Sequence, residues 1–116
     1  NAYLIKYNAY NIDINTTINA NNAEITIATA KIANFDGVIE KGKLGITSSY
    51  FKNSSIKETS ATLDFVDLDG ETIKVNVDGG NLYYYNDHIK SNIVLTIEGQ
   101  TLKTNISVAD DIKRGE

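Results

Sequence analysis

Alternation of apolar and polar residues with a period of two is the feature that most restricts what this chain can fold into. It is clearest between Ala61 and Val77, where apolar residues occupy every second position on both sides of Leu68-Asp69-Gly70. A period of two places successive side chains on opposite faces of a β-strand, whereas a helix needs apolar residues three and four apart. The stretch therefore predicts two strands, each with one buried face.

We expect these two strands to form an antiparallel hairpin. A three-residue loop at Leu68-Asp69-Gly70 would pair Phe65 with Ile73 and would set all the apolar side chains of both arms on one face. Gly70 would supply the residue of positive φ that such a loop requires. A two-residue loop would instead set apolar against polar residues, so we favour the longer loop.

The rest of the chain shows the same pattern in short stretches separated by turn residues. Strands are predicted at residues 2–7, 12–18, 23–33, 56–65 and 82–85. A bulge is expected at residues 28–30, because Ile32 lies out of phase with the residues before it. A closing hairpin is predicted with a Gly99-Gln100 loop, which would pair Ile97 with Leu102.

About eight or nine short strands without a helix are typical of an antiparallel β-sandwich. We therefore expect residues 1–116 to form a single immunoglobulin-like β-sandwich domain with two stacked sheets. Residues 1–9 would be an N-terminal strand that pairs with its own sandwich or adds to the open edge of a neighbouring subunit. We expect no internal sequence repeat.

Composition and charge exclude several classes of function. The chain contains no Cys, so disulfides and thiolate metal sites are excluded. Its net charge is −4, with both signs scattered and no basic stripe, so we expect no nucleic-acid partner. No apolar run reaches the roughly 18 residues of a membrane helix. The sequence begins at Asn1 without Met, so we expect an upstream segment to have been removed, either by processing or by truncation of the chain. A signal peptide or a membrane anchor is a candidate for that segment.

The residue types needed for catalysis are sparse. His88 is the only His, and its neighbour Asp87 would point to the other side of a strand rather than pair with it. Acidic residues gather around the predicted hairpin tip without the twelve-residue spacing of a calcium loop. These residues are Asp64, Asp67, Asp69 and Glu71. We therefore expect no enzymatic activity, no bound metal and no cofactor.

Two groups of residues are candidates for binding a partner. The first group lies in the N-terminal strand and would act through an open sheet edge: Tyr3, Leu4, Ile5 and Tyr7. The second is an aromatic run, Tyr83, Tyr84 and Tyr85. Alternation sends Tyr84 to the face opposite the other two, so one face belongs to the core and the other is available for stacking or packing.

Three asparagines begin the Asn-X-Ser/Thr pattern of N-glycosylation: Asn15, Asn53 and Asn105. Asn53 lies in a polar segment and is the best candidate of the three. A chain rich in Asn and Thr also produces such triplets by chance, so both explanations stay open.

The Cys-free, Thr-, Asn- and Ile-rich strand pattern from about Ile12 to Val108 resembles the immunoglobulin-like domains of prokaryotic surface appendages. The stretches Ala61–Val77 and Ile93–Val108 carry the resemblance. Such domains include pilus subunits and the soluble domains of the archaellum stator, which attach to the surface layer. The resemblance implies a non-enzymatic, extracellular or cell-surface protein that binds like subunits or an envelope or surface-layer protein, as a homo-oligomer. The alternative is a carbohydrate-binding module that uses exposed tyrosines.

Overall fold

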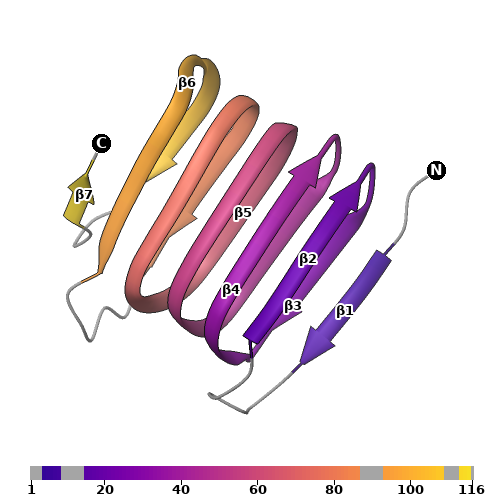
Figure 1. Ribbon diagram of the computed structural model, residues 1–116, viewed down its shortest axis with the longest axis vertical. Helices are drawn as coiled ribbons and strands as arrows, with labels where there is room; N and C mark the ends of the chain where they lie inside the picture. Colours follow the sequence, from indigo (N-terminus) through magenta and orange to yellow (C-terminus); the bar gives the residue numbers. More distant parts are fainter. Residues whose placement is uncertain (1–3, 9–14, 87–92, 109–112, 116) are drawn as a thin grey trace.

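The computed structural model describes residues 4–8, 15–86, 93–108 and 113–115. These residues form β-strands and no helix (Figure 1). The strands are β1 (Leu4–Asn8), β2 (Asn15–Asn21), β3 (Glu24–Ala28), β4 (Lys31–Glu40), β5 (Lys43–Tyr85), β6 (Val94–Val108) and β7 (Lys113–Gly115). β5 is one extended run of 43 residues that winds repeatedly around the molecule (Figure 1). The described chain is therefore extended backbone wound into successive turns, rather than a set of separate strands.

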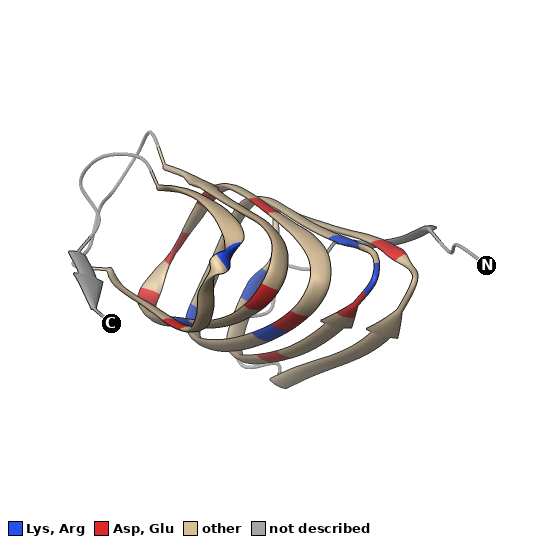
Figure 2. Ribbon diagram, turned by 90° about the horizontal axis from the view of Figure 1, so that it is seen from above, with Lys and Arg blue, Asp and Glu red and all other residues tan. Residues whose placement is uncertain are grey.

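All pairings between these strands are parallel, and most advance by the same number of residues. Asn15 pairs with Asn34, and Asn34 pairs with Asn53, so each turn of the coil takes 19 residues. Successive turns of β5 also lie side by side, because Asn81 Nδ2 donates to Thr62 Oγ1 at 3.1 Å. One turn earlier, the Thr62 N–H donates to the carbonyl of Gly42, the residue before β5, at 2.8 Å. The fold is a parallel β-solenoid of about four turns, seen from above in Figure 2.

Two faces of the solenoid enclose a single apolar core. The first face consists of β1, β3, residues 43–47, 62–66 and 80–84 of β5, and residues 104–108 of β6. The second face consists of β2, residues 34–40 of β4, residues 53–59 and 72–78 of β5, residues 94–100 of β6, and β7. Inward side chains repeat at the same height in each turn, so that Ile25 packs beside Leu44 and Ile27 beside Ile46. The core is thus built of columns of stacked apolar residues.

The prediction of an all-β chain is confirmed, but the antiparallel immunoglobulin-like sandwich and the absence of a repeat are wrong. Phe65 and Ile73 are both buried, yet Ile73 pairs in parallel with Leu95 of β6. A period of two reports which side of a strand is buried, and it carries no information on which strand lies beside it. The sandwich and the solenoid therefore share the same alternation.

The closing hairpin is also wrong. Residues 94–100 and 104–108 of β6 lie on different faces, where they pair with residues 72–78 and 80–84 of β5. Leu102, predicted to pack against Ile97, is fully exposed at the corner between these two arms. Gly99 does have a positive φ of 92°, but it pairs in parallel with Val77 on the second face instead of forming a hairpin loop.

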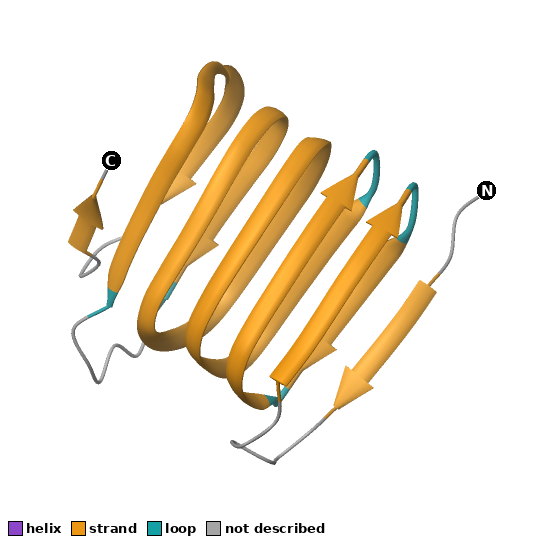
Figure 3. Cartoon of the chain, viewed as in Figure 1, coloured by secondary structure: helices purple, strands orange, loops and turns teal. Residues whose placement is uncertain are grey.

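Corners of the solenoid are made by residues in the left-handed region of φ. Asn22, Lys41 and Ser60 have φ between 51° and 55°, and the same corner one turn further on is made by Gly79. A second corner repeats at Thr29, Ser48 and Asp67. The bulge predicted at residues 28–30 is this second corner, and it reverses the phase of the inward residues. Figure 3 shows the short loops at some of these corners.

Gly70 has a different role from the one expected of it. It is not among the residues of positive φ. Instead, a Cβ atom at Gly70 would lie 2.0 Å from the Phe51 carbonyl oxygen of the turn before. Gly42 has the same constraint, because its Cβ atom would lie 2.2 Å from the Ala23 carbonyl oxygen. These glycines let neighbouring turns approach closely at the corners.

The corner at Lys41 is expected to be a site where glycine stabilises the fold. A left-handed conformation costs a non-glycine residue about 1–2 kcal/mol, and glycine avoids this cost. Glycine also increases the entropy of the unfolded chain, which offsets part of the stabilisation. We expect Lys41→Gly to raise the free energy of unfolding by about 0.5–1 kcal/mol in urea denaturation. Lys57→Gly, at an exposed strand position, should lower it by a similar amount. Equal losses in both variants would contradict this account of the corners.

Candidate functional site

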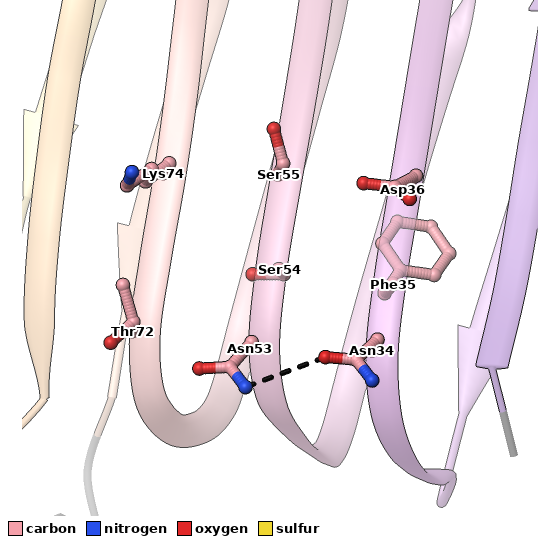
Figure 4. Close-up of a pocket in the computed structure, with 8 residues that line it drawn as sticks. All are labelled: Asn34, Phe35, Asp36, Asn53, Ser54, Ser55, Thr72 and Lys74. Atoms are coloured by element: carbon pink, nitrogen blue, oxygen red, sulfur yellow. Dashed lines mark hydrogen bonds between the residues drawn. The ribbon is translucent and has the colours of Figure 1, made fainter.

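The outward side chains of the solenoid form ladders of hydrogen-bonded amides. On the second face, Asn34 Nδ2 donates to Asn15 Oδ1 at 2.8 Å. Asn53 Nδ2 in turn donates to Asn34 Oδ1 at 3.4 Å, the dashed line in Figure 4. On the first face, Asn105 Nδ2 donates to Asn81 Oδ1 at 3.1 Å. All three predicted glycosylation asparagines are exposed and belong to these ladders. Their modification stays a prediction.

Next to the asparagine ladder, the second face is hollowed. The larger hollow, whose lining residues are drawn in Figure 4, has a volume of about 390 Å³. It is lined by Asn34, Phe35, Asp36, Asn53, Ser54, Ser55, Thr72 and Lys74. A second hollow of about 230 Å³ shares Ser55 and Lys74 with the first and continues to Asn76 and Glu98. We call the two together the lateral groove.

The lateral groove exists because a small residue stands between two long ones. Ser55 lies one turn from Asp36 and, by the 19-residue step, one turn from Lys74. Neither Asp36 nor Lys74 has an ion-pair partner among the described residues, whereas on the first face Lys43 and Asp64 approach to 4.0 Å. The groove therefore offers a carboxylate and an ammonium group, with hydroxyl and amide groups between them. Elsewhere, charged residues are interspersed along the turns (Figure 2).

The aromatic run divides as its alternation predicts. Tyr83 and Tyr85 point outward from the first face and are 43% and 50% exposed, whereas Tyr84 is 2% exposed. The Tyr84 hydroxyl donates to the Leu68 carbonyl, and its ring meets Phe65 edge-on with centroids 5.9 Å apart. Burial, with a smaller contribution from the charge of Asp69, raises the pKa of Tyr84. Tyr84 thus belongs to the core, and only its two neighbours are placed to meet a partner.

The N-terminal candidates lie at one end of the stack. Leu4, Ile5 and Tyr7 belong to β1, which pairs with β3 of the same chain. Tyr3 and His88 fall outside the described residues. The described ranges contain no cluster of three or more His, Cys, Asp or Glu residues arranged to hold a metal ion. They also contain no helix of the length and hydropathy that a membrane crossing needs.

A buried carboxylate, which sequence reasoning missed, ties successive turns together. Glu58 is 1% exposed and occupies the column between Ile39 and Val77. Its Oε2 accepts the Ala61 N–H at 2.9 Å, and its Oε1 accepts the Asp78 N–H at 3.0 Å. Burial raises the pKa of Glu58 above its ordinary value of 4.5, and the two N–H groups oppose that rise. The period of two, which places Glu58 inward two residues after Ile56, is the signal that could have found it.

Glu58 is expected to make stability depend on pH. The pKa of Glu58 is higher in the folded than in the unfolded chain. Its contribution to the free energy of unfolding is therefore fully present at a pH below the unfolded-state pKa, and it is lost as the pH rises through the folded-state pKa. Urea denaturation from about pH 4 to about pH 7 should show wild type losing stability relative to Glu58→Gln, which does not titrate. A difference between the two proteins that is constant over this range would refute the assignment.

Two buried hydroxyls flank Phe35 in one inward column of the second face. Thr16 pairs with Phe35, and Phe35 pairs with Ser54. Neither Thr16 Oγ1 nor Ser54 Oγ has a hydrogen-bond partner among the described residues. A buried hydroxyl without a partner costs about 1–3 kcal/mol, so this column contains a local weakness beneath the lateral groove.

Removing the Ser54 hydroxyl is expected to stabilise the protein. Ser54→Ala keeps the shape of the side chain and deletes the unpartnered group, so the free energy of unfolding should rise by about 1 kcal/mol. The neighbouring Ser55→Ala, at an exposed position, serves as the control and should change stability by less than about 0.5 kcal/mol. A loss of stability in Ser54→Ala would mean that its hydroxyl is satisfied in solution.

The geometry defines a class of protein: a parallel β-solenoid with ladders of polar side chains on its outer faces. Comparison of the chain with family models, curated proteins and solved structures finds no match. The candidate site therefore consists of the lateral groove, the two exposed tyrosines and the two ends of the stack.

Proposed function

We propose that this chain is a non-enzymatic structural and protein-binding segment of a cell-surface or extracellular protein, which binds an envelope or surface-layer protein or like subunits. The observation that carries the proposal is the lateral groove on the second face. Its side chains project from strands that are hydrogen-bonded to both neighbouring turns, so they are held in fixed positions. A surface of this kind pays little conformational entropy when a partner binds.

The chemistry of the groove favours a polar protein surface as its partner. Asp36 and Lys74 can each meet an opposite charge, and Asn53 and Ser55 can exchange hydrogen bonds with a backbone. The hollows are shallow and lie on an open sheet, unlike the enclosed pockets that bury most of a small ligand. The proposed location outside the cell rests on the resemblance of the Cys-free, Asn- and Thr-rich composition to that of surface-appendage domains.

Carbohydrate binding is the second candidate, and a specific observation favours it. Tyr83 and Tyr85 stand two residues apart on one outward strand, about 6.6 Å from each other along the strand. Exposed aromatic rings stack on the apolar faces of sugars, and two rings in a row can follow neighbouring units of a polysaccharide. Tyr84, between them, cannot contribute, because it lies in the core.

The two candidates differ in what they bind on the cell envelope. We expect labelled chain to bind saturably to envelopes from the organism that makes it, and protease treatment of the envelopes to abolish binding. The double substitution Asp36→Ala and Lys74→Ala should weaken binding about fivefold or more, since each lost charged contact is worth up to about 1 kcal/mol. Lys43→Ala, on the opposite face, is the matched control and should bind as wild type does.

Carbohydrate binding predicts the reverse pattern in the same assay. Binding would then survive protease and be lost in Tyr85→Ala, with no effect of the groove substitutions. Absence of envelope binding, together with antibody labelling of the cells only after permeabilisation, would contradict both candidates and the surface location.

A further inference from the structure

We propose that two copies of this chain associate through their first faces, related by a two-fold axis. The axis runs parallel to the strands, between the turn of residues 43–47 and the turn of residues 62–66. This inference rests on the proposed function only in counting like subunits among the partners. It places them on the face opposite the lateral groove.

The outward side chains of the first face change from small to large along the stack. Residues 24–28 pair with residues 43–47, and the same step of 19 residues leads to residues 62–66 and then to residues 81–85. The first two of these turns carry small outward side chains: Thr26, Ala28, Gly45 and Thr47. The next two carry larger ones: Asp64, Val66, Tyr83 and Tyr85. We call the two halves together the stepped surface.

Gly45, in the small half, has no structural reason to be glycine within its own chain. Its φ is not positive, and a Cβ atom there would meet nothing nearer than the carbonyl oxygens of Ile25 and Asp64, both at 3.9 Å. Gly42 and Gly70, in contrast, are required by close contacts with neighbouring turns. A glycine inside a strand weakens it and often marks a place where a ligand or another backbone approaches closely. Gly45 therefore indicates that something rests against the small half.

A second copy provides a surface of the matching shape. The two-fold axis places the large half of each copy on the small half of the other. The facing positions are Tyr83 with Thr26, Tyr85 with Ala28, Val66 with Thr47, and Asp64 with Gly45. Because a two-fold contact uses the same surface on both copies, each of these facing pairs occurs twice.

The distribution of charge selects this position of the axis. Lys43 faces the partner's Thr62, and Glu24 faces the partner's Asn81, so no like charges stand directly opposite each other. The Lys43–Asp64 ion pairs, at 4.0 Å within each copy, lie near the axis as a neutral group of four charges. Moving the axis by half a turn in either direction sets Lys43 or Asp64 opposite its own copy. Like charges that face each other across an interface oppose association.

The size of the side chains selects the direction of the axis. Tyr83, Tyr85 and Val66 are 43%, 50% and 36% exposed, and the proposed contact covers them with the small half of the partner. An axis along the stack would instead set Tyr83 against its own copy and Gly45 against its own copy, which leaves a gap. Tyrosine is among the residues that most often anchor protein interfaces when it fills a complementary surface.

The symmetry and the size of the contact determine what forms. An isologous contact closes at two copies, so the species should stop at a dimer. The contact covers four turns of about five residues each, which is smaller than the roughly 800 Å² per partner of a standard interface. We therefore expect a weak, reversible dimer with a dissociation constant on the order of 0.1 mM.

Exchanging the sizes of one facing pair tests the proposal. Thr26→Tyr sets two tyrosine rings against each other, and Tyr83→Thr leaves a gap, so each single variant should weaken the dimer by about tenfold or more. In the double variant each facing pair again has one large and one small side chain. Its dissociation constant should return to within about threefold of wild type. Val38→Tyr, at an exposed position on the second face, is the matched control.

Sedimentation velocity from micromolar to millimolar concentration reads out the dimer, and circular dichroism checks that every variant is folded. We expect wild type and Val38→Tyr to approach twice the monomer mass and no more. A wild type that stays monomeric at millimolar concentration, or that grows beyond a dimer, would overturn the proposal. So would a double variant that associates no more tightly than the weaker single variant, or an equal loss in Val38→Tyr.

The envelope assay separates this inference from the proposed function. The lateral groove faces away from the contact, so Thr26→Tyr should bind envelopes as a single chain does. Envelope binding without a dimer would leave the proposed function standing and end this inference. A dimer that passes the exchange of sizes, without envelope binding, would do the reverse. Because the contact covers Tyr83 and Tyr85, the dimer also excludes carbohydrate binding at those two residues.

Discussion

Parallel hydrogen bonding between turns that are 19 residues apart is the interaction on which the rest of this structure depends. It sets each residue beside its equivalent in the next turn. Equivalent positions in successive turns therefore tend to be all apolar, all polar or all corner residues. The asparagine ladder, the stacked core and the repeated corners of positive φ are three consequences of that one register. A slip of one residue would turn every inward side chain outward.

The register tolerates extra residues where they can be expelled from the stack. Val94 lies beside Thr72, a step of 22 residues, and Thr104 lies beside Gly80, a step of 24. Residues 101–103, between the two arms of β6, are all exposed, and Leu102 is one of them. The further two residues of the second step fall at this exposed corner, and the pairing resumes at Thr104 with the same residues inward.

The sequence predicted which side chains are buried far better than which strands are neighbours. Leu63, Phe65, Val75 and Tyr84 all point into the core, as their alternation indicates. The pairing could not follow from the same signal, because antiparallel hairpins and parallel coils bury the same alternate positions. The recurrence of Asn at 15, 34 and 53 held the missing information.

The corners and the candidate site were harder to predict for physical reasons. Lys41 and Thr29 adopt a positive φ that their residue types disfavour, so only the stack around them explains it. The lateral groove draws Asp36, Ser55 and Lys74 from three successive turns, and their proximity depends on knowing the repeat. Of its lining, only Asn53 was singled out from the sequence, and for a different reason.

The constant step also has a consequence for how a gene of this kind can evolve. Duplicating or losing one whole segment of 19 codons adds or removes one turn of the solenoid and leaves every remaining column intact. Losing a single codon within a strand shifts all later inward residues to the outside. The length of related genes should therefore change by whole turns, while insertions and deletions of one or two codons should occur at the corners between strands.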